Sequence, residues 1–229
     1  MITYRIFAFI LKRLTATALT AIAATILFAG FAPQAHAAGG ALKPADGIAV
    51  DRNNGMIRNC TLGFVFKGDA RALTASHCGE IGQQIRTPDG SPVGLVVAHG
   101  SEDIRIIDIA TDLKVYGDVE GVGTVSGYMT LDELNRTRPL LCKKGVTTGL
   151  TCGTMTGTAK DSYFTFGGGS DEGDSGAPIY AITPEGKILA AGILSGHAEE
   201  DPHTVFACIM SAAAVENRHR FWFTDPPGI

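Results

Sequence analysis

The sequence predicts an all-β fold, either a barrel or a sandwich. Its apolar runs are short and have the β-branched composition of strands, and turn-forming sequences separate them. Pro88-Asp-Gly90 and Pro184-Glu-Gly186 are two such turns, and the 229 residues include 29 glycines. The candidate strands are 93–98, 104–109, 121–125, 163–166, 179–182 and 188–194.

Two short helices are expected among these strands. Thr130 and Glu133 have the spacing of a capping box, which predicts a helix from Thr130 to Asn135. The second helix is expected near the C-terminus, where Ala212-Ala-Ala-Val-Glu-Asn217 follows Ser211.

The first 37 residues have the pattern of a secretory signal peptide. Three basic residues lie within the first 13 positions, and an apolar stretch follows from Leu14 to Phe31. This stretch is also long enough for a membrane anchor that is never cleaved. The small residues of Ala35-His-Ala37 favour cleavage after Ala37 instead.

Cleavage leaves residues 38–229, a mature chain of 192 residues that we expect to form one domain. It removes three positive charges and no acidic residue, so the formal net charge moves from −4 to −7. The mature chain has no second segment that could span a bilayer and no basic patch. We therefore expect a secreted, extracellular monomer with no nucleic-acid partner, no stable membrane association, and no metal or other cofactor.

A glycine-rich loop, Asp171-Glu-Gly-Asp-Ser-Gly-Ala-Pro178, carries a candidate nucleophile. Gly173 and Gly176 let the backbone turn sharply around Ser175. A serine hydroxyl becomes a good nucleophile when a base removes its proton and nearby donors stabilise the oxyanion that forms. The backbone N–H groups of Gly173 and Ser175 are the candidate oxyanion hole. An ordinary surface turn uses the same residue types, so the loop needs a second observation.

That second observation is a histidine about a hundred residues upstream, in Leu73-Thr-Ala-Ser-His-Cys78. An apolar run at 62–66 and a turn at 67–69 precede this segment, which predicts a hairpin with His77 at the end of its second strand. A lone histidine is more often structural. Together with the Ser175 loop, His77 is better interpreted as a general base.

The two segments resemble those of the trypsin/chymotrypsin-like serine proteases, which use Thr-Ala-Ala-His-Cys and Gly-Asp-Ser-Gly-Gly-Pro in the chain order His, Asp, Ser. Ser76 and Ala177 stand where the family has an alanine and a glycine. The resemblance implies two six-stranded antiparallel β-barrels, the first over about 45–125 and the second over about 138–212, with the active site between them.

The resemblance also implies an aspartate between the histidine and the serine. Asp103-Ile-Arg-Ile-Ile resembles the family's Asp-Ile-Ala-Leu-Leu strand, so Asp103 is expected to orient His77 and to stabilise its imidazolium. Asp108 begins a second Asp-Ile-Ala sequence and is the alternative. Asp103 is favoured because strand-forming residues follow it, whereas Asp108 would place Thr111 and Asp112 inside the strand.

The cysteines refine the resemblance. Cys142-Lys-Lys-Gly-Val-Thr-Thr-Gly-Leu-Thr-Cys-Gly153 resembles a segment of secreted bacterial proteases of the alpha-lytic protease and streptogrisin type. The resemblance implies two disulfides, Cys60–Cys78 and Cys142–Cys152. Cys208 lies in an apolar run and is expected to be a buried thiol. A zinc site is disfavoured because no histidines cluster with the cysteines.

Two further sets of residues take their roles from the resemblance. Bacterial relatives place an arginine after the first cysteine of this segment, where it pairs with the aspartate before the nucleophile. This implies a pair between Asp174 and Lys143, with Arg136 or Arg138 as alternatives.

The segment Ala191-Gly-Ile-Leu-Ser-Gly-His-Ala198 resembles the edge strand that pairs with the substrate backbone. Its candidate substrate-binding residues are Ser195, Gly196 and His197. Asp171 and Glu172 lie near the expected pocket base and leave two interpretations open. They either enter the pocket and favour basic side chains or face the solvent.

The sequence therefore predicts a secreted serine endopeptidase that cleaves protein or peptide substrates through a Ser-His-Asp triad and an acyl-enzyme. The alternative is a secreted protease-like binding protein that is catalytically weak or inactive. A serine esterase is disfavoured because the chain has neither the Gly-x-Ser-x-Gly elbow nor the order Ser, Asp, His.

Overall fold

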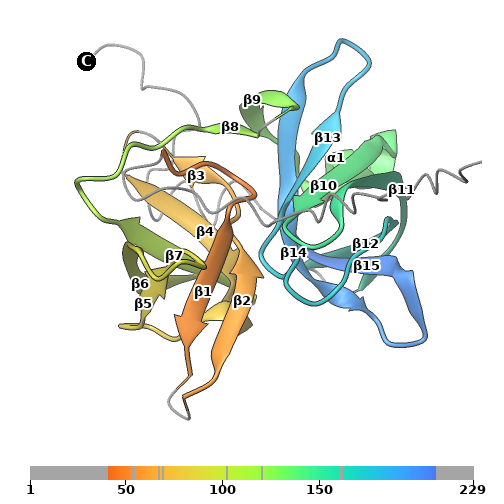
Figure 1. Cartoon of the computed structure of the whole chain (residues 1–229). Helices are drawn as coiled ribbons and strands as arrows, with labels where there is room; N and C mark the ends of the chain where they lie inside the picture. Colours follow the sequence, from red (N-terminus) through yellow and green to blue (C-terminus); the bar gives the residue numbers. More distant parts are fainter. Residues whose placement is uncertain are drawn as a thin grey trace, which may run out of the picture. The chain divides into compact units, whose positions relative to one another are not determined.

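The computed structural model of the protein describes residues 41–209, except 53–54, 67, 69, 102, 120 and 160–161 (Figure 1). The expected signal peptide and C-terminal helix lie outside the described residues. The described chain is almost entirely β, with one α-helix, α1 (Leu131–Thr137), and one 3-10 turn at Ser76–Cys78. Within these ranges, no helix is long and apolar enough to cross a membrane.

Seven strands form the first sheet, in the spatial order β2-β1-β5-β6-β7-β4-β3, and neighbouring strands are antiparallel. Their bounds are β1 Gly47–Asp51, β2 Ile57–Thr61, β3 Val65–Phe66, β4 Arg71–Ala75, β5 Gln84–Arg86, β6 Pro92–Ser101 and β7 Ile104–Ile109.

The first sheet has one strand more than the six expected, because a single segment is split in two. β2 and β3 belong to the continuous segment 57–66, which is interrupted at Gly63. The N–H of Gly63 donates to the carbonyl of Leu73 at 2.6 Å, so the segment turns from β1 toward β4 at this point. One bent segment therefore forms both edges of the sheet.

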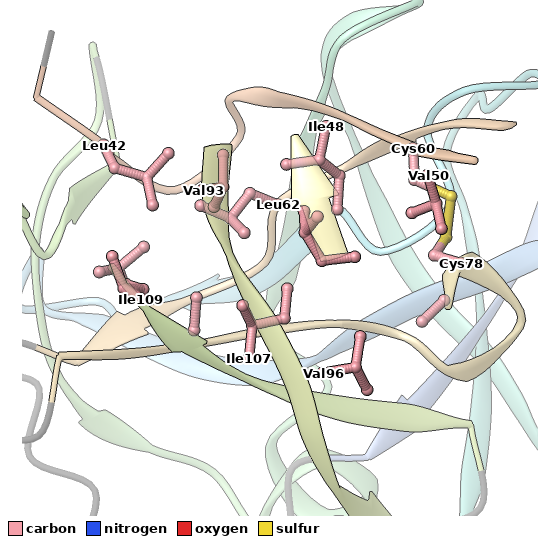
Figure 2. Packing of buried hydrophobic residues seen from close by; sticks show 14 residues of the cluster. Leu42, Ile48, Val50, Cys60, Leu62, Cys78, Val93, Val96, Ile107 and Ile109 are labelled. Carbon is pink, nitrogen blue, oxygen red and sulfur yellow. A yellow bond between two sulfur atoms is a disulfide. The ribbon is translucent and has the colours of Figure 1, made fainter. Parts of the chain in front are cut away.

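Buried apolar side chains of the first sheet pack together and form its core (Figure 2). Ile48 and Val50 alternate inward from β1, and Ile107 and Ile109 do so from β7. Full burial of such a side chain stabilises the fold by about 1.5–3 kcal/mol. Figure 2 also shows the Cys60–Cys78 disulfide beside this core, so the cross-link and the apolar packing hold the same end of the sheet.

Eight strands form the second sheet, in the order β13-β10-β11-β12-β15-β14-β9-β8. Their bounds are β8 Asp118–Val119, β9 Gly123–Tyr128, β10 Leu140–Gly145, β11 Gly149–Ala159, β12 Tyr163–Gly167, β13 Pro178–Ile182, β14 Ile188–Ala198 and β15 Asp201–Ile209. β13 also pairs with β14, which closes six of the strands into a barrel.

β9 and β8 extend the second barrel. β9 runs parallel to β14, with Val125 opposite Ile188, and β8 pairs with β9. Residues 121–125 are expected at the end of the first barrel, but this pairing attaches the segment to the second sheet. The parallel pairing joins segments that are distant in the sequence.

The second sheet has an apolar core of its own. A third apolar cluster contains residues of both sheets. Phe64, Leu73 and Ile106 come from the first sheet, and Tyr180 and Ile193 come from the second. All five are essentially inaccessible to solvent. The two sheets therefore share a core in addition to the core that each has of its own.

This contact depends on the absence of a side chain at Gly63. A Cβ there would lie 2.7 Å from Ile193 Cδ1, 2.8 Å from the Leu73 carbonyl oxygen and 3.0 Å from that of Gly176. Glycine thus allows the bent segment to approach the second sheet.

Both expected disulfides are present. The Cα atoms of Cys60 and Cys78 are 6.2 Å apart, and those of Cys142 and Cys152 are 4.0 Å apart. The second pair is short because the two residues lie directly opposite each other on β10 and β11. Cys208 is a buried thiol in β15, as expected.

The expected capping box begins α1. Thr130 Oγ1 accepts the Glu133 N–H at 3.2 Å, and a Glu133 carboxylate oxygen accepts the Thr130 N–H at 2.8 Å. The helix ends at Arg138, which adopts a left-handed conformation with φ of 44°.

Candidate active site

His77 lies in the 3-10 turn that follows β4. Two contacts fix its backbone: the Cys60–Cys78 disulfide ties the turn to β2, and the Arg58 guanidinium donates a hydrogen bond to the His77 carbonyl oxygen. The side chain of His77 keeps 38% of its surface exposed. The turn thus presents an accessible imidazole on a fixed backbone.

Asp103 directly precedes β7 and is only 8% exposed. Its Oδ1 lies 3.4 Å from His77 Nδ1, and its Oδ2 accepts a hydrogen bond from Ser195 Oγ. Burial raises the pKa of this carboxyl, but hydrogen bonds from His77, Ser195 and Ser76 outweigh burial and lower the pKa from 3.8 to about 2. Asp103 is therefore ionised at neutral pH and can hold the imidazole in the tautomer that leaves Nε2 available as an acceptor.

The alternative acid, Asp108, has a different partner. It lies opposite Arg71 in the antiparallel pairing of β4 and β7, and Arg71 Nε is 2.6 Å from Asp108 Oδ1. The same pairing places Asp103 beside the turn that carries His77, because β7 begins opposite the end of β4. Of the two acids, the structure brings Asp103 into contact with His77.

Ser175 lies in the loop between β12 and β13, where two glycines have left-handed backbone angles. φ is 98° at Gly173 and 91° at Gly176, a conformation that side chains with a Cβ rarely adopt. A Cβ at Gly176 would also lie 2.3 Å from the Thr61 carbonyl oxygen and from Thr74 Oγ1. The backbone conformation and the close packing therefore both require a glycine at position 176.

The loop is held through its carbonyl groups. Thr61 Oγ1 donates to the Gly173 carbonyl at 2.9 Å, and the Thr61 N–H donates to the Ser175 carbonyl at 2.8 Å. None of the hydrogen bonds found among residues 41–209, in the part that is described, uses the N–H of Gly173 or of Ser175 as donor. Both N–H groups are thus available to an oxyanion.

The Ser175 hydroxyl is likewise unengaged. Among the described residues it makes no hydrogen bond, so the contact with His77 that a triad requires is not closed in this state. Catalytic hydrogen bonds are often long before substrate binds.

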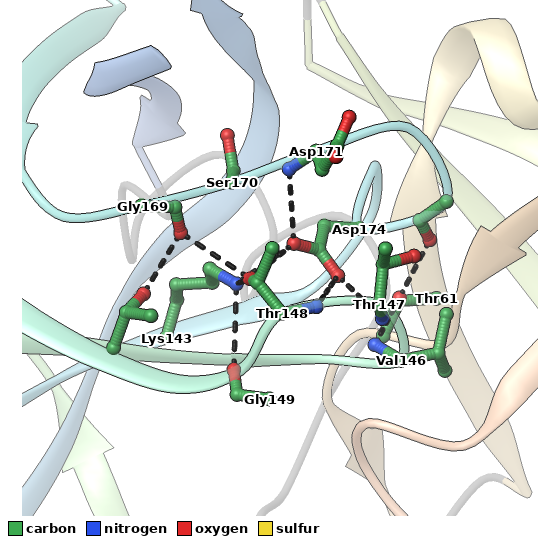
Figure 3. A network of polar contacts seen from close by, with 12 residues as sticks. Thr61, Lys143, Val146, Thr147, Thr148, Gly149, Gly169, Ser170, Asp171 and Asp174 are labelled. Atoms are coloured by element: carbon green, nitrogen blue, oxygen red, sulfur yellow. Dashed lines mark hydrogen bonds and ion pairs between the residues drawn. The ribbon is translucent and has the colours of Figure 1, made fainter. Parts of the chain in front are cut away.

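A buried ion pair lies beneath the loop (Figure 3). Lys143 and Asp174 are both 0% exposed, and Lys143 Nζ lies 2.9 Å from Asp174 Oδ2. Thr148 Oγ1 donates to the same carboxylate at 2.5 Å, and the Thr147 N–H donates to Oδ1 at 2.8 Å. Burial raises the pKa of Asp174, but Lys143, Thr148 and the Thr147 N–H outweigh it and lower the pKa.

The structure therefore brings Asp174 to Lys143 and not to the two alternative cations. Arg138 NH1 instead donates to the Met155 carbonyl at 3.1 Å, and Arg136 lies in the last turn of α1. Gly145 makes room for the pair, because a Cβ there would lie 2.2 Å from Asp174 Oδ1.

The three candidate substrate-binding residues lie near the end of β14 and differ in their contacts. Ser195 is bound to Asp103 through its hydroxyl. Gly196 has open space where a Cβ would be. His197 is exposed, and its Nδ1 lies 3.3 Å from Ser170 Oγ. Asp171 and Glu172 are both exposed, which favours the solvent-facing interpretation of these acids.

Sequence reasoning missed three contributors to the site. Ser76 has no role in the sequence analysis, yet its hydroxyl donates to Asp103 Oδ1 at 2.5 Å. Ser195 was assigned to substrate only, and its bond to Asp103 spans 92 positions in the chain. Thr61 had no assigned role. For Ser76 a signal was available, because a hydroxyl beside the base can reach the acid that orients the base.

The architecture of the two sheets is that of the chymotrypsin-like fold, which this chain shares with solved serine proteases. The Cellulomonas bogoriensis chymotrypsin is similar to it with a TM-score of 0.59 and 20% identity, over 80% of this chain and 100% of that chain. Thermobifida fusca protease A is similar with a TM-score of 0.56 and 23% identity, over 75% of this chain and 93% of that chain. A glutamic-acid-specific serine protease that uses a histidine triad in substrate binding is similar with a TM-score of 0.58 and 23% identity, over 75% of this chain and 95% of that chain.

Within this fold, the chain belongs to the family of two Mycobacterium tuberculosis proteins. Uncharacterized protein Rv1815 is 30% identical to it over 200 residues, and uncharacterized protein MT1863 is 30% identical over 192 residues. Each comparison covers 76% of this chain and 84% of the relative. No protein-family profile matches the chain.

Proposed function

We propose that the protein is a secreted serine endopeptidase. The observation that carries this proposal is the Asp103 carboxylate, which contacts His77 Nδ1 with one oxygen and Ser195 Oγ with the other. The carboxylate belongs to the first sheet and Ser195 to the second, so the two sheets meet at the reactive group. The protease-like fold implies protein or peptide substrates.

In the proposed reaction, Ser175 Oγ attacks the carbonyl carbon of a peptide bond while His77 Nε2 takes the hydroxyl proton. The ionised Asp103 stabilises the imidazolium. The N–H groups of Gly173 and Ser175 donate to the oxyanion of the tetrahedral intermediate. His77 then returns the proton to the leaving amine, which leaves an acyl-enzyme. A water molecule, deprotonated by His77, releases the acid and restores the Ser175 hydroxyl.

Substrate is expected to pair with the end of β14. β13 reaches only as far as Ile193, and beyond it β15 alone pairs with β14 in the described part of the chain. One edge of Ser195, Gly196 and His197 therefore has no neighbouring strand, and an extended peptide can add there through backbone hydrogen bonds.

Secretion is part of the same proposal. Two disulfides are compatible with an oxidising, extracellular compartment, and the sequence pattern of residues 1–37 predicts export with cleavage after Ala37.

A fluorophosphonate labelling experiment on secreted protein tests both parts. The phosphonyl group should add to Ser175 of the wild type and not to the Ser175→Ala variant, because only an activated serine displaces the leaving group. The intact mass should correspond to a mature chain that begins at Ala38. A correctly folded protein that takes no label would support the alternative, a protease-like binding protein. An intact mass that still includes residues 1–37 would contradict signal cleavage.

A further inference from the structure

Three donors converge on a single oxygen of the Asp103 carboxylate. Oδ1 accepts the Ser76 hydroxyl at 2.5 Å and the Ser76 N–H at 3.0 Å, and His77 Nδ1 lies 3.4 Å from it. The other oxygen, Oδ2, accepts Ser195 Oγ. The donors are thus unevenly divided between the two oxygens.

A carboxylate oxygen has about two lone-pair sites, so three donors at Oδ1 compete. The Ser76 hydroxyl is at the short distance of a charge-assisted O–H···O⁻ hydrogen bond, about 2.5–2.7 Å. The imidazole is at the long limit of an N–H···O contact. The hydroxyl is therefore the favoured partner of Oδ1 and the imidazole the disfavoured one.

The Ser76 hydroxyl is dispensable for the local fold. The Ser76 N–H also lies 3.3 Å from the Asp103 carbonyl oxygen, so the backbone keeps its bonds to Asp103 when the side chain is shortened. Ser76 is half-buried, and truncation opens no deep cavity.

We propose that Ser76 is a positioning residue that restrains catalysis, because its hydroxyl competes with His77 for Asp103 Oδ1. The inference rests on the proposed function, to which it adds a role for the Ser76 hydroxyl. The bond between Asp103 and the imidazole orients the base and stabilises the imidazolium that forms during reaction. A competitor at the same oxygen weakens that bond without removing any triad residue.

The test compares Ser76→Ala and Ser76→Gly, which lack the hydroxyl, with Ser76→Thr, which keeps it. In steady-state hydrolysis of a peptide ester, both hydroxyl-free variants should have kcat raised roughly two- to tenfold, with KM unchanged. The corresponding fall in activation free energy is a part of the strength of one charge-assisted hydrogen bond. Ser76→Thr should stay near the wild-type kcat. Unchanged or lower kcat in both hydroxyl-free variants overturns the proposal.

A second readout does not depend on turnover. The proton on His77 Nδ1 should give a downfield proton NMR resonance that moves further downfield in Ser76→Ala as its bond to Asp103 shortens. This measurement is made with Ser175 replaced by alanine in every sample. If the wild type takes no fluorophosphonate, the proposed function fails, and the resonance alone decides the competition at Oδ1. An unmoved resonance overturns it.

Discussion

At the scale of single residues, the ammonium group of Lys143 is fully buried beneath the Ser175 loop. It lies 2.9 Å from Asp174 and also donates to the Gly149 carbonyl at 3.3 Å. Asp174 directly precedes Ser175, so the ion pair fixes the backbone that carries the proposed nucleophile and one proposed oxyanion donor. The charge of Lys143 is therefore expected to matter for turnover as well as for stability.

Replacement of Lys143 by methionine should separate these effects. It leaves the Asp174 carboxylate buried without its cation, which typically costs about 3–5 kcal/mol. The free energy of unfolding in urea should fall by this amount, and kcat should fall more than KM rises because the loop loses its orientation. Lys143→Arg keeps the charge and should retain more activity than Lys143→Met. A wild-type kcat in Lys143→Met would show that the cation is not needed.

The Asp103 carboxyl makes a pH-dependent contribution to stability. Its pKa is lowered from 3.8 to about 2, so the folded state holds fewer protons than the unfolded state between these values. The stabilisation is complete above pH 3.8 and is lost as the pH falls toward 2, and it amounts to about 2 kcal/mol.

Urea unfolding of the wild type and of Asp103→Asn between pH 2 and pH 5 measures this contribution. The difference in unfolding free energy between the two proteins should shrink as the pH falls through that window. A constant difference would mean that the carboxyl titrates alike in the folded and unfolded states.

At the scale of elements, the end of β2 supports the Ser175 loop, which lies between β12 and β13 of the other sheet. Thr61 is the last residue of β2 and is 0% exposed. Its hydroxyl donates to the Gly173 carbonyl at 2.9 Å and accepts the Val146 N–H at 3.2 Å. A strand of the first sheet thereby fixes the carbonyl group of Gly173, the residue whose N–H is one of the two proposed oxyanion donors.

Thr61→Val keeps the shape of the side chain and removes the hydroxyl. It leaves the buried Gly173 carbonyl without that partner, which costs about 1–3 kcal/mol, while the N–H of the exposed Val146 can turn to water. The kcat for a peptide ester should fall about tenfold or more if part of this strain displaces the oxyanion donor, whereas Thr61→Ser should restore it. Inhibition by a peptide aldehyde, whose adduct carries the oxyanion, should weaken in parallel. Unchanged aldehyde affinity would limit Thr61 to a role in stability.

The elements also show what the sequence can and cannot predict. His77 and Ser175 each lie in a short motif whose chemistry depends on adjacent residues, so the local sequence is enough to predict them as a base and a nucleophile. An Asp-Ile pair begins at both Asp103 and Asp108. The residues that follow favour Asp103, and the register of β4 with β7 places Asp103 beside His77. The bond from Ser195 to Asp103 and the parallel pairing of β9 with β14 depend on tertiary contacts that leave no local pattern.

At the scale of the whole molecule, catalysis would require the two sheets to keep a fixed relation. His77 and Asp103 belong to the first sheet, while Ser175 and Ser195 belong to the second half of the chain. The shared apolar cluster joins the two sheets, and Ile193 of this cluster packs closely against the backbone of Gly63. Because each sheet also has its own core, stability and active-site alignment can be tested separately.

Ile193→Ala and Ile107→Ala form a matched pair for this purpose. Both isoleucines are 0% exposed, but Ile193 packs in the shared cluster and Ile107 in the core of the first sheet alone. Each substitution should lower the free energy of unfolding by about 2–5 kcal/mol. The fluorophosphonate labelling rate per folded molecule should fall in Ile193→Ala, because the cavity lets Ser175 shift relative to His77, and should be retained in Ile107→Ala. Equal labelling rates in the two variants at equal folded fractions would mean that polar contacts, such as those of Thr61, align the sheets without help from the shared core.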